Sequence, residues 1–330
     1  MLTVKLVEDF SELLELKPEW SCFLESLPEV TPFQLSEWLL TWWRHFGSGS
    51  LRVSVFRDGS QVVAVLPFFR HEWQARRQLT LVGSGVSDYL EPAIAQRSCA
   101  DVLQKLVIEL KQDRCWDVCS WQDLNADSPL RELAWGDEFM PTVEADSECA
   151  ETAISGDFEA WYARRPHGLR RNVRRYLEKA QAIDEPRFYV RYEPDPELVN
   201  ALITLHAARW QKQGEPGMIV RNQSAGFLRE VFDRFAARDM LRFFILRFRS
   251  RIVAIICGFY YRNVFYSYLS AFDPEYEKFG FGRILLYHSL RHSFEHRYCS
   301  WNFLRGSEPY KFDWGARHIP KCRITVIRNS

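Results

Sequence analysis

Two glycines stand where an expected strand gives way to an expected helix, and this spacing suits the binding of a phosphate group. The strand covers 264–272, a loop ending in Lys-Phe-Gly-Phe-Gly282 follows, and the helix begins near Arg283. Amide N–H groups at a helix start point outward, the helix dipole adds positive potential, and glycine lets an anion approach the backbone. The loop therefore predicts a phosphate or diphosphate site, with a plain glycine-rich turn as the alternative.

This loop lies in one of two copies of a repeated pattern. The segment LRVSVFRDGSQVVAVLPFFR, which starts at Leu51, is matched without a gap by LRFFILRFRSRIVAIICGFYYR, which starts at Leu241. Each copy has two runs of β-branched and aromatic residues around a polar turn, as is typical of an antiparallel hairpin. The loop at 88–97, which corresponds to the glycine loop, has no glycine and carries carboxylates. Only the second copy is expected to bind a phosphorylated ligand.

The elements around the two hairpins follow the same order. Helical periodicity precedes the hairpins at Ser36–Phe46 and Ala225–Ala237 and returns after them at about 99–113 and 282–297. Each later helix leads into a strand that begins with Cys-Ser-Trp. The repeated order predicts a duplication, with an N-terminal half over 1–150 and a C-terminal half over 151–330. A long basic helix is expected to begin in the second half at 155–159, which resembles an N-cap.

Composition indicates a globular protein with no bias towards nucleic acid. The chain has 330 residues, with 43 basic residues balancing 43 acidic ones and aromatic side chains making up 15%. It shows no apolar run of membrane-spanning length and no signal-peptide pattern at its start, and its eight cysteines are scattered. We therefore expect a cytoplasmic protein with reduced thiols and no transmembrane segment.

The glycine loop resembles the pyrophosphate loop of the GNAT acyltransferases, which bind acyl-CoA. The family's fuller pattern has a basic residue three positions before the first glycine, where this chain has Glu277 with Lys278 beside it. Other stretches resemble the CelD/BcsL branch of that superfamily, acetyltransferases named for cellulose biosynthesis. These stretches are Thr31–Trp38, Ser87–Pro92, Leu169–Arg175 and Asn302–Ala316.

The CelD/BcsL branch is similar in turn to the Fem aminoacyl transferases, which have two GNAT-like halves. The segment Tyr310–Gly315 resembles their Phe-Lys-x-x-Phe-Gly signature. The resemblance implies an α+β fold of two tandem GNAT-like halves, each a mixed, mostly antiparallel sheet flanked by helices. It implies N- or O-acyl transfer, without a metal, from acetyl-CoA or another acyl-CoA to a small or sugar-linked acceptor, in polysaccharide or envelope biosynthesis.

The same resemblance proposes roles for individual residues. Tyr310 is the candidate general acid, Lys311 the candidate stabiliser of charge on the thioester or intermediate, and Glu308 or Asp313 the candidate base. The alternatives are a tyrosine packed through its ring, an exposed lysine and solvated carboxylates. The donor is expected to contact Leu269, Ala271, Lys278, Phe279, Gly280, Phe281, Gly282 and Arg283. The acceptor, in a cleft between the halves, is expected to contact Gln34, Trp38, Asp88, Tyr89 and Arg305, and Asp88 is a further candidate base.

A dense basic stretch covers 164–179 and has three interpretations. It either binds a phosphate-bearing acceptor, or binds RNA, or is a solvated helix paired with the acidic connection at 137–148. His288, His292 and His296 share one helix face, and without a further motif they favour a polar face rather than a metal site.

Two other functions fit the same residues. One is a Fem-like transferase that uses aminoacyl-tRNA as donor, and the other is a non-catalytic binding protein on the same fold.

Overall fold

The computed structural model of the chain describes residues 1–213 and 222–329, which divide into two compact units. Unit 1 contains Met1–Ser147 and the C-terminal segment from Pro320 onward, and unit 2 contains Glu148–Ile319. The C-terminal segment was expected in the second half. It instead forms a strand of unit 1, because its backbone pairs with strands of that sheet on both sides.

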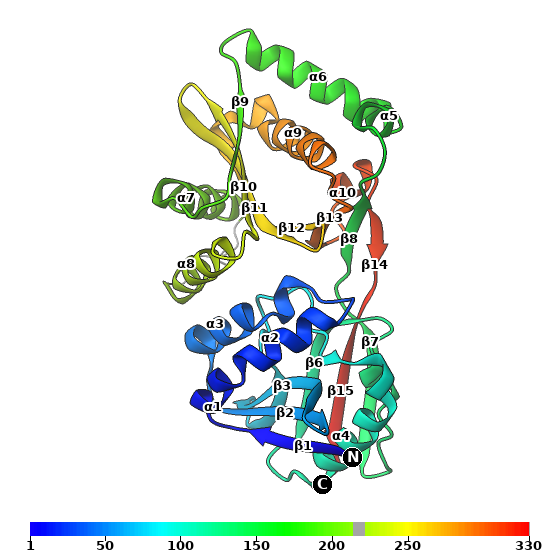
Figure 1. Cartoon of the computed structure of the whole chain (residues 1–330). Helices are drawn as coiled ribbons and strands as arrows, with labels where there is room; N and C mark the ends of the chain where they lie inside the picture. The colour runs from blue at the N-terminus through cyan, green and yellow to red at the C-terminus, as the bar shows by residue number, and fades with distance from the viewer. Residues whose placement is uncertain (214–221, 330) are drawn as a thin grey trace. The chain divides into compact units, whose positions relative to one another are not determined.

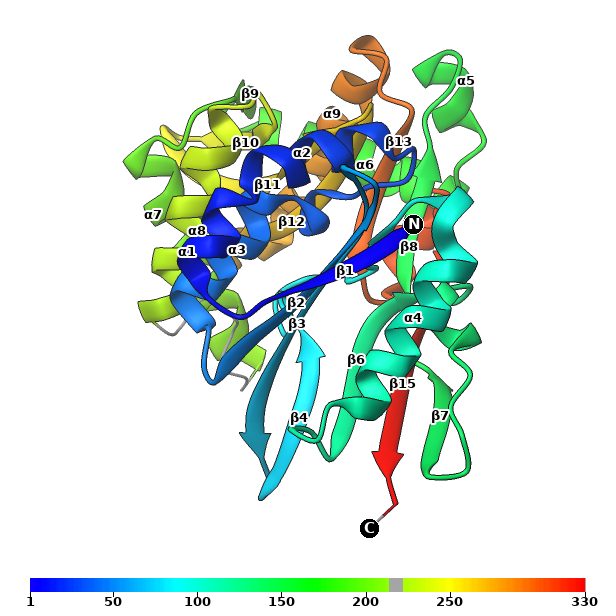
Figure 2. The same ribbon diagram turned by 60° about the horizontal axis from the view of Figure 1, so that its bottom comes forward.

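Unit 1 is a mixed sheet in the order β1-β2-β3-β4-β6-β15-β7, with β5 paired to β3 (Figures 1 and 2). Its strands are β1 (Leu2–Val7), β2 (Ser50–Asp58), β3 (Gln61–Trp73), β4 (Arg76–Leu81), β5 (Ala93–Ile94), β6 (Val118–Asn125), β7 (Phe139–Ala145) and β15 (Lys321–Arg328). Its helices are α1 (Phe10–Glu15), α2 (Lys17–Ser26), α3 (Ser36–Phe46) and α4 (Cys99–Gln112), with short 3-10 turns at Pro32–Gln34, Gln96–Ser98 and Pro129–Glu132.

Unit 2 repeats this design with a sheet in the order β14-β8-β13-β12-β11-β10-β9. Its strands are β8 (Cys149–Ala153), β9 (Arg187–Arg191), β10 (Leu241–Phe248), β11 (Arg251–Tyr261), β12 (Val264–Phe272), β13 (Ser300–Arg305) and β14 (Arg317–Ile319). Its helices are α5 (Phe158–Ala163), α6 (His167–Gln181), α7 (Pro196–Gln213), α8 (Asn222–Ala236), α9 (Phe281–Glu295) and α10 (Pro309–Asp313), with the 3-10 turn η4 at Pro274–Phe279. Figure 1 shows α7 and α8 on one side of this sheet and α9 on the other.

The expected fold class is confirmed, and the duplication extends to local irregularities. In each unit one pair of strands is parallel, β4 with β6 and β12 with β13, while the other pairings in the described residues are antiparallel. The two hairpins carry a register shift at the same place, before Arg57 and before Arg247. Each of these arginines forms an ion pair with a glutamate near the start of a helix, Glu19 on α2 and Glu197 on α7.

The long basic helix that was expected from 155–159 is interrupted. Asp157 caps α5 by accepting a hydrogen bond from the Ala160 amide at 2.9 Å, but this helix ends at Ala163. Pro166 then stands as the N-cap of α6, which carries most of the basic residues. Proline has no N–H to donate and disfavours helical geometry in the residue before it, so it separates the two helices.

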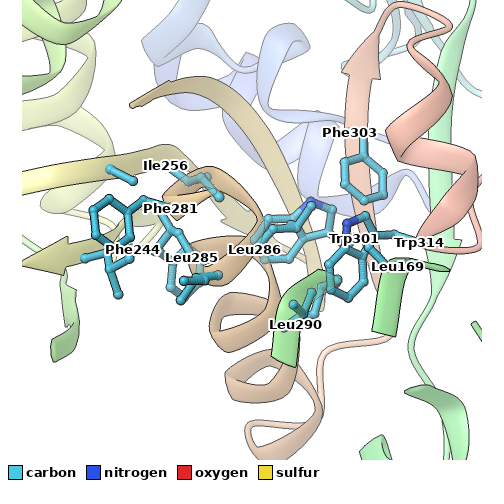
Figure 3. Close-up of a cluster of buried hydrophobic side chains, with 14 of the residues drawn as sticks. Leu169, Phe244, Ile256, Phe281, Leu285, Leu286, Leu290, Trp301, Phe303 and Trp314 are labelled. Carbon is cyan, nitrogen blue, oxygen red and sulfur yellow. The ribbon is translucent and has the colours of Figure 1, made fainter. Parts of the chain in front are cut away.

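The core of unit 2 lies between α9 and its sheet. Leu285, Leu286 and Leu290 of α9 point towards Phe244 and Ile256 of the sheet on one side and towards the tryptophans at 301 and 314 on the other (Figure 3). This packing fixes the start of α9 relative to β12. Among the helices of residues 1–213 and 222–329, none combines the length and hydropathy that crossing a bilayer requires.

Candidate active site

Unit 2 contains a cavity of about 390 Å³ on the side of the sheet where α9 begins. Residues of β11, β12, η4, α9, β13 and α10 line it, and α6 contributes one residue. The lining residues are Tyr176, Ile255, Ile256, Ser267, Ser270, Ala271, Phe272, Asp273, Tyr276, Glu277, Gly280, Phe281, Gly282, Arg283, Leu285, Leu286, Phe303 and Tyr310. Most of these side chains are apolar, so the polar groups at the two ends of the cavity determine its chemistry.

The cavity opens where two parallel strands stop pairing. β12 pairs with β13 only over Val264–Tyr266, and its later residues continue along β11 alone. A register shift opposite Gly258 further bends β12. Only glycine fits at this position, because a Cβ at Gly258 would lie 2.1 Å from the Tyr266 carbonyl oxygen. Backbone groups on the β13-facing edge of 267–272 are therefore exposed to the cavity.

The glycine loop brings the start of α9 to the cavity wall. The Asp273 carboxylate accepts a hydrogen bond from the Glu275 amide at 3.0 Å and begins η4. Gly280 then takes the left-handed conformation, with φ of 59°, and is the N-cap of α9 without a side-chain cap. Within a helix, the N–H groups of Phe281 and Gly282 have no acceptor four residues back. These two amides therefore lie at the cavity wall without a partner inside the helix.

The two glycines of the loop have different surroundings. A Cβ at Gly282 would meet only the Phe272 ring, at 3.4 Å, so space remains beside this residue. A Cβ at Gly280 would lie 2.5 Å from the ring of Tyr176, a residue of α6 that packs against the loop. An anion therefore has room beside Gly282, while Tyr176 covers Gly280.

Charges around the loop are mixed. Arg283 and Glu277 are both exposed, and both line the cavity. Glu277 occupies the position where the GNAT pattern has a basic residue. Lys278 is exposed, with its ammonium 5.4 Å from the centre of the Phe279 ring. The Lys278 carbonyl accepts a hydrogen bond from Lys179 of α6 at 3.2 Å. Arg283 is thus the cation of this loop that reaches the cavity.

The remaining donor-site candidates divide between cavity and core. Ala271 and Phe281 line the cavity, whereas Leu269 and Phe279 are buried in the packing of unit 2 outside it. Tyr310 lines the end of the cavity, with its ring edge-on to Phe303 at 6.2 Å between centres.

Lys311 is adjacent to Tyr310 but lies outside the cavity. Its side chain is 2% exposed, and its ammonium donates to the carbonyls of Leu304, Arg305 and Gly306 at 3.2, 2.6 and 3.0 Å. The same ammonium forms an ion pair with Glu308 at 2.9 Å. The lysine therefore ties the end of β13 to α10 and holds the turn that presents Tyr310.

The other catalytic and acceptor candidates of unit 2 also lie outside the cavity lining. Glu308 is exposed and engaged by Lys311, and Asp313 is half-buried at the last residue of α10. Arg305 is exposed at the end of β13. The structure thus brings together Tyr310 and the glycine loop, but it does not bring these three side chains to the cavity.

The acceptor candidates of unit 1 take part in its internal packing. Trp38 is fully buried and donates its indole N–H to the Ser87 hydroxyl at 2.8 Å, and the Gln34 amide donates to the Glu91 carbonyl at 2.8 Å. The Lys321 ammonium lies 3.3 Å from the centre of the buried Tyr89 ring. Asp88, in the same loop, is half-buried.

Glu91 fills the part of unit 1 that corresponds to the glycine loop. Its carboxylate accepts hydrogen bonds from Ser128 at 2.6 Å and from the Asn125 amide at 3.0 Å. Burial raises the pKa of Glu91 to about 7, and these hydrogen bonds only partly oppose the increase. The cavity beside it measures about 10 Å³, too little for a diphosphate.

Several cavity residues were not among the predicted site residues, including Tyr176, Ser267, Ser270 and Phe303. Tyr176 had been read only as part of the basic stretch. It lies seven residues after the buried Leu169, at the spacing that returns to the same helix face, and this was a usable signal. The two serines interrupt an otherwise apolar strand, which could also have marked them.

The three histidines predicted to share one face of α9 have different surroundings. Ligand atoms of His292, Glu295 and His296 lie within 4.8 Å of one another, and His288 is not part of this group. The rings of His292 and His296 stack with their centres 3.7 Å apart. Burial, with His296 and Arg242 nearby, lowers the pKa of His292 to about 4, and His288 stacks on Phe188 at 5.5 Å.

Comparison with known proteins identifies the class of this fold. Residues 167–312, which include α6, the glycine loop and Tyr310, match the family model described as an acetyltransferase (GNAT) domain. This stretch of unit 2 is therefore similar to a GNAT acetyltransferase domain. No curated protein matches the sequence.

Solved structures share the fold over most of the chain at low sequence identity. FemX is 12% identical with a TM-score of 0.66, over 93% of this chain and 95% of that one. A conserved protein of unknown function from Bacteroides thetaiotaomicron is 12% identical with a TM-score of 0.61, over 99% and 100%. A tandem GNAT protein from the clavulanic acid biosynthesis pathway is 10% identical with a TM-score of 0.50, over 99% and 98%.

Proposed function

We propose that unit 2 transfers an acyl group from acetyl-CoA or another acyl-CoA to an amine or hydroxyl of a small or sugar-linked acceptor. The observation that carries this proposal is the uncapped start of α9, whose free amides open into a cavity that ends at Tyr310. The resemblance to the CelD/BcsL branch further supports a role in polysaccharide or envelope biosynthesis, in the cytoplasm.

The residues present fit a CoA donor in part. The amides of Phe281 and Gly282, together with Arg283, would bind the diphosphate beside Gly282, where there is room. The apolar walls would hold the pantetheine arm, and the edge of β12 near Ala271, beyond its pairing with β13, would place an amide at the thioester oxygen. Glu277 acts against this binding, since its carboxylate lies on the same wall.

Tyr310 is the proposed general acid that returns a proton to the departing thiolate. The candidates Glu308 and Asp313 do not line the cavity, so we assign no side chain as the base. The acceptor amine or hydroxyl would attack in its neutral form, and the proton that it loses as the new bond forms and the C–S bond breaks would pass to solvent. Lys311 is assigned a positioning role, because its ammonium is fully engaged beneath the turn that carries Tyr310.

A binding experiment on Gly282→Glu tests the donor site. Gly282 is the second residue of α9, where an acidic side chain is favourable to the helix, so the variant is expected to fold. The new carboxylate would meet the diphosphate at close range, where like charges about 4 Å apart repel by about 4 kcal/mol at an effective dielectric constant near 20. We expect the Kd for acetyl-CoA, measured by calorimetry, to rise at least ten-fold.

Gly168→Glu is the matched control, because Gly168 is the second residue of α6 and has open space around its Cβ position. It should leave the Kd for acetyl-CoA unchanged. If neither the natural chain nor the control binds any acyl-CoA, the proposal fails. Equal binding by Gly282→Glu and the natural chain would place the donor elsewhere.

Two features favour a second candidate, a Fem-like transferase with an aminoacyl-tRNA donor. Glu277 replaces the basic residue of the CoA-binding pattern, and Tyr176 covers Gly280. Such a protein would bind aminoacyl-tRNA with an affinity that falls steeply as the salt concentration rises, and it would not bind acetyl-CoA. A filter-binding titration at two salt concentrations separates the two donors.

A further inference from the structure

Unit 2 has a second concave site, a groove lined by residues of α5, α6 and α9. Figure 1 shows where these three helices lie in unit 2. Its volume is about 580 Å³, larger than that of the acyl-transfer cavity. The two sites share no lining residue, although α6 contributes to both. Tyr176 of α6 faces the cavity, while His167, Arg170, Arg171 and Arg174 line the groove.

The cations of the groove follow from the period of α6. Leu169, Val173 and Ala180 form the buried face of the helix, and the basic residues that line the groove lie beside this face or opposite it. Arg170 is held in place by donating through Nε to the Arg165 carbonyl at 3.1 Å. This bond leaves the terminal nitrogens of the Arg170 guanidinium available to a ligand.

Carboxylates neutralise little of this charge. Within residues 1–213 and 222–329, Arg170 and Arg171 form no ion pair. The two glutamates of the groove contact other arginines at long range, Glu178 with Arg174 at 3.9 Å and Glu159 with Arg291 at 4.0 Å. These pairs are largely exposed, and such pairs contribute little.

The acidic connection that was expected to pair with the basic helix has other partners. Asp146 pairs with Arg323 at 3.2 Å, and Glu148 contacts His318 at 2.8 Å. Asp146 and Glu148 therefore have partners within their own units, and for the other acidic residues of the connection the pairing with 164–179 stays a prediction.

Two tyrosines form an aromatic wall of the groove. Tyr162 of α5 and Tyr287 of α9 pack edge to face, with ring centres 5.0 Å apart. Burial raises the pKa of Tyr162 to about 12, so its hydroxyl remains a hydrogen-bond donor at neutral pH. A planar ring or a sugar can pack on such a wall while the arginines bind its phosphates.

We propose that this groove binds the diphosphate group of a small molecule, at a site separate from the acyl-transfer cavity. Arg170, Arg171 and Arg174 bind the phosphate oxygens, since guanidinium groups match them in a bidentate manner. The sugar or base next to the diphosphate packs on the wall of Tyr162 and Tyr287. The proposal does not depend on the donor of the acyl transfer.

Calorimetric titration of the full chain with inorganic pyrophosphate, ADP and UDP-glucose tests the proposal. Arg170→Ala/Arg171→Ala is expected to raise the Kd for pyrophosphate at least ten-fold. Arg187→Ala, an exposed arginine on β9 outside the groove, should bind as the natural chain does. Thermal unfolding of each variant establishes that it is folded.

The Gly282→Glu variant separates the groove from the start of α9, which also attracts diphosphates. Retained pyrophosphate binding in Gly282→Glu, with loss in the double arginine variant, supports the groove. Loss in Gly282→Glu alone overturns the proposal, as does absence of pyrophosphate binding by the natural chain. Tighter binding of ADP or UDP-glucose than of pyrophosphate supports packing of the attached ring on the wall of Tyr162 and Tyr287. A single-stranded RNA that outcompetes all three probes also overturns the proposal, because the groove would then serve a polymer.

Discussion

Replacing Lys311 distinguishes a catalytic lysine from one that holds the active-site turn. The three carbonyls that its ammonium contacts end β13, and the lysine itself is 2% exposed. Removing one partner of a buried charged pair typically costs about 3–5 kcal/mol. Glu308 is half-exposed and regains water when the lysine is lost, so we expect the lower end, about 3 kcal/mol, for Lys311→Ala.

Lys311→Met tests the same point with the apolar length of the side chain retained. It should still lose about 3 kcal/mol, because the carbonyls lose their donor whichever apolar side chain replaces it. For a unit of this size such a loss lowers the melting temperature by about 6–12 °C. Lys278→Ala, at an exposed lysine, is the control and should unfold at the temperature of the natural chain.

The assay is urea unfolding combined with turnover of an acyl-CoA substrate below the melting temperature. If Lys311 holds the turn, we expect unfolding at a lower urea concentration and a reduced turnover, because Tyr310 is then misplaced. A catalytic Lys311 predicts the opposite combination, a fall in turnover of two or more orders of magnitude with stability and donor binding intact. That second result would refute the positioning role argued above.

Three further outcomes follow from buried groups and from the loop. Because burial raises the pKa of Glu91 to about 7, the native state holds a proton that the unfolded chain releases, so the stability of unit 1 should fall as pH rises from 4.5 to 7. Glu91→Gln should flatten that fall in pH-dependent urea titrations. His292 should change stability with pH in the opposite direction. Because its pKa is lowered to about 4, the unfolded chain binds the proton before the native state does, and unit 2 should lose stability as pH falls from 6.5 to 4. His292→Phe should remove this loss. Gly280→Ala should lower the free energy of unfolding by about 1–2 kcal/mol, because its φ of 59° is left-handed and the methyl meets the Tyr176 ring. Gly280→Ala/Tyr176→Ala should recover the part due to the ring, and no recovery would mean that the backbone conformation alone sets the loss.

Local pattern predicted the elements of each half closely. The helix expected at Ser36–Phe46 and the strand expected at 264–272 have those bounds in the structure. Both are set by interactions between near neighbours, namely a helical apolar stripe and a β-branched, aromatic run. The interruption at Pro166 was not predicted, because the basic residues on both sides of the proline suggested one continuous helix. The proline instead stands between the end of α5 and the start of α6.

Position within the fold separated residues that are adjacent in sequence. Tyr310 and Lys311 share the short helix α10, yet the tyrosine reaches the cavity and the lysine is buried beneath the turn. No periodicity could assign these directions, since α10 has only five residues. The covering of Gly280 by Tyr176 likewise depends on how α6 packs across η4.

The sequence by itself determined the duplicated order of elements and the glycine-containing start of α9, because these depend on spacing along a short stretch of chain. Tertiary structure alone decided which sheet receives β15. Its alternating residues suit either sheet, and the pairing with β6 and β7 joins segments nearly 200 residues apart. Tertiary structure also decided which polar side chains meet at the cavity and which are buried in the packing of each unit. The physical reason is that burial and hydrogen bonding between distant segments determine which groups can bind a ligand.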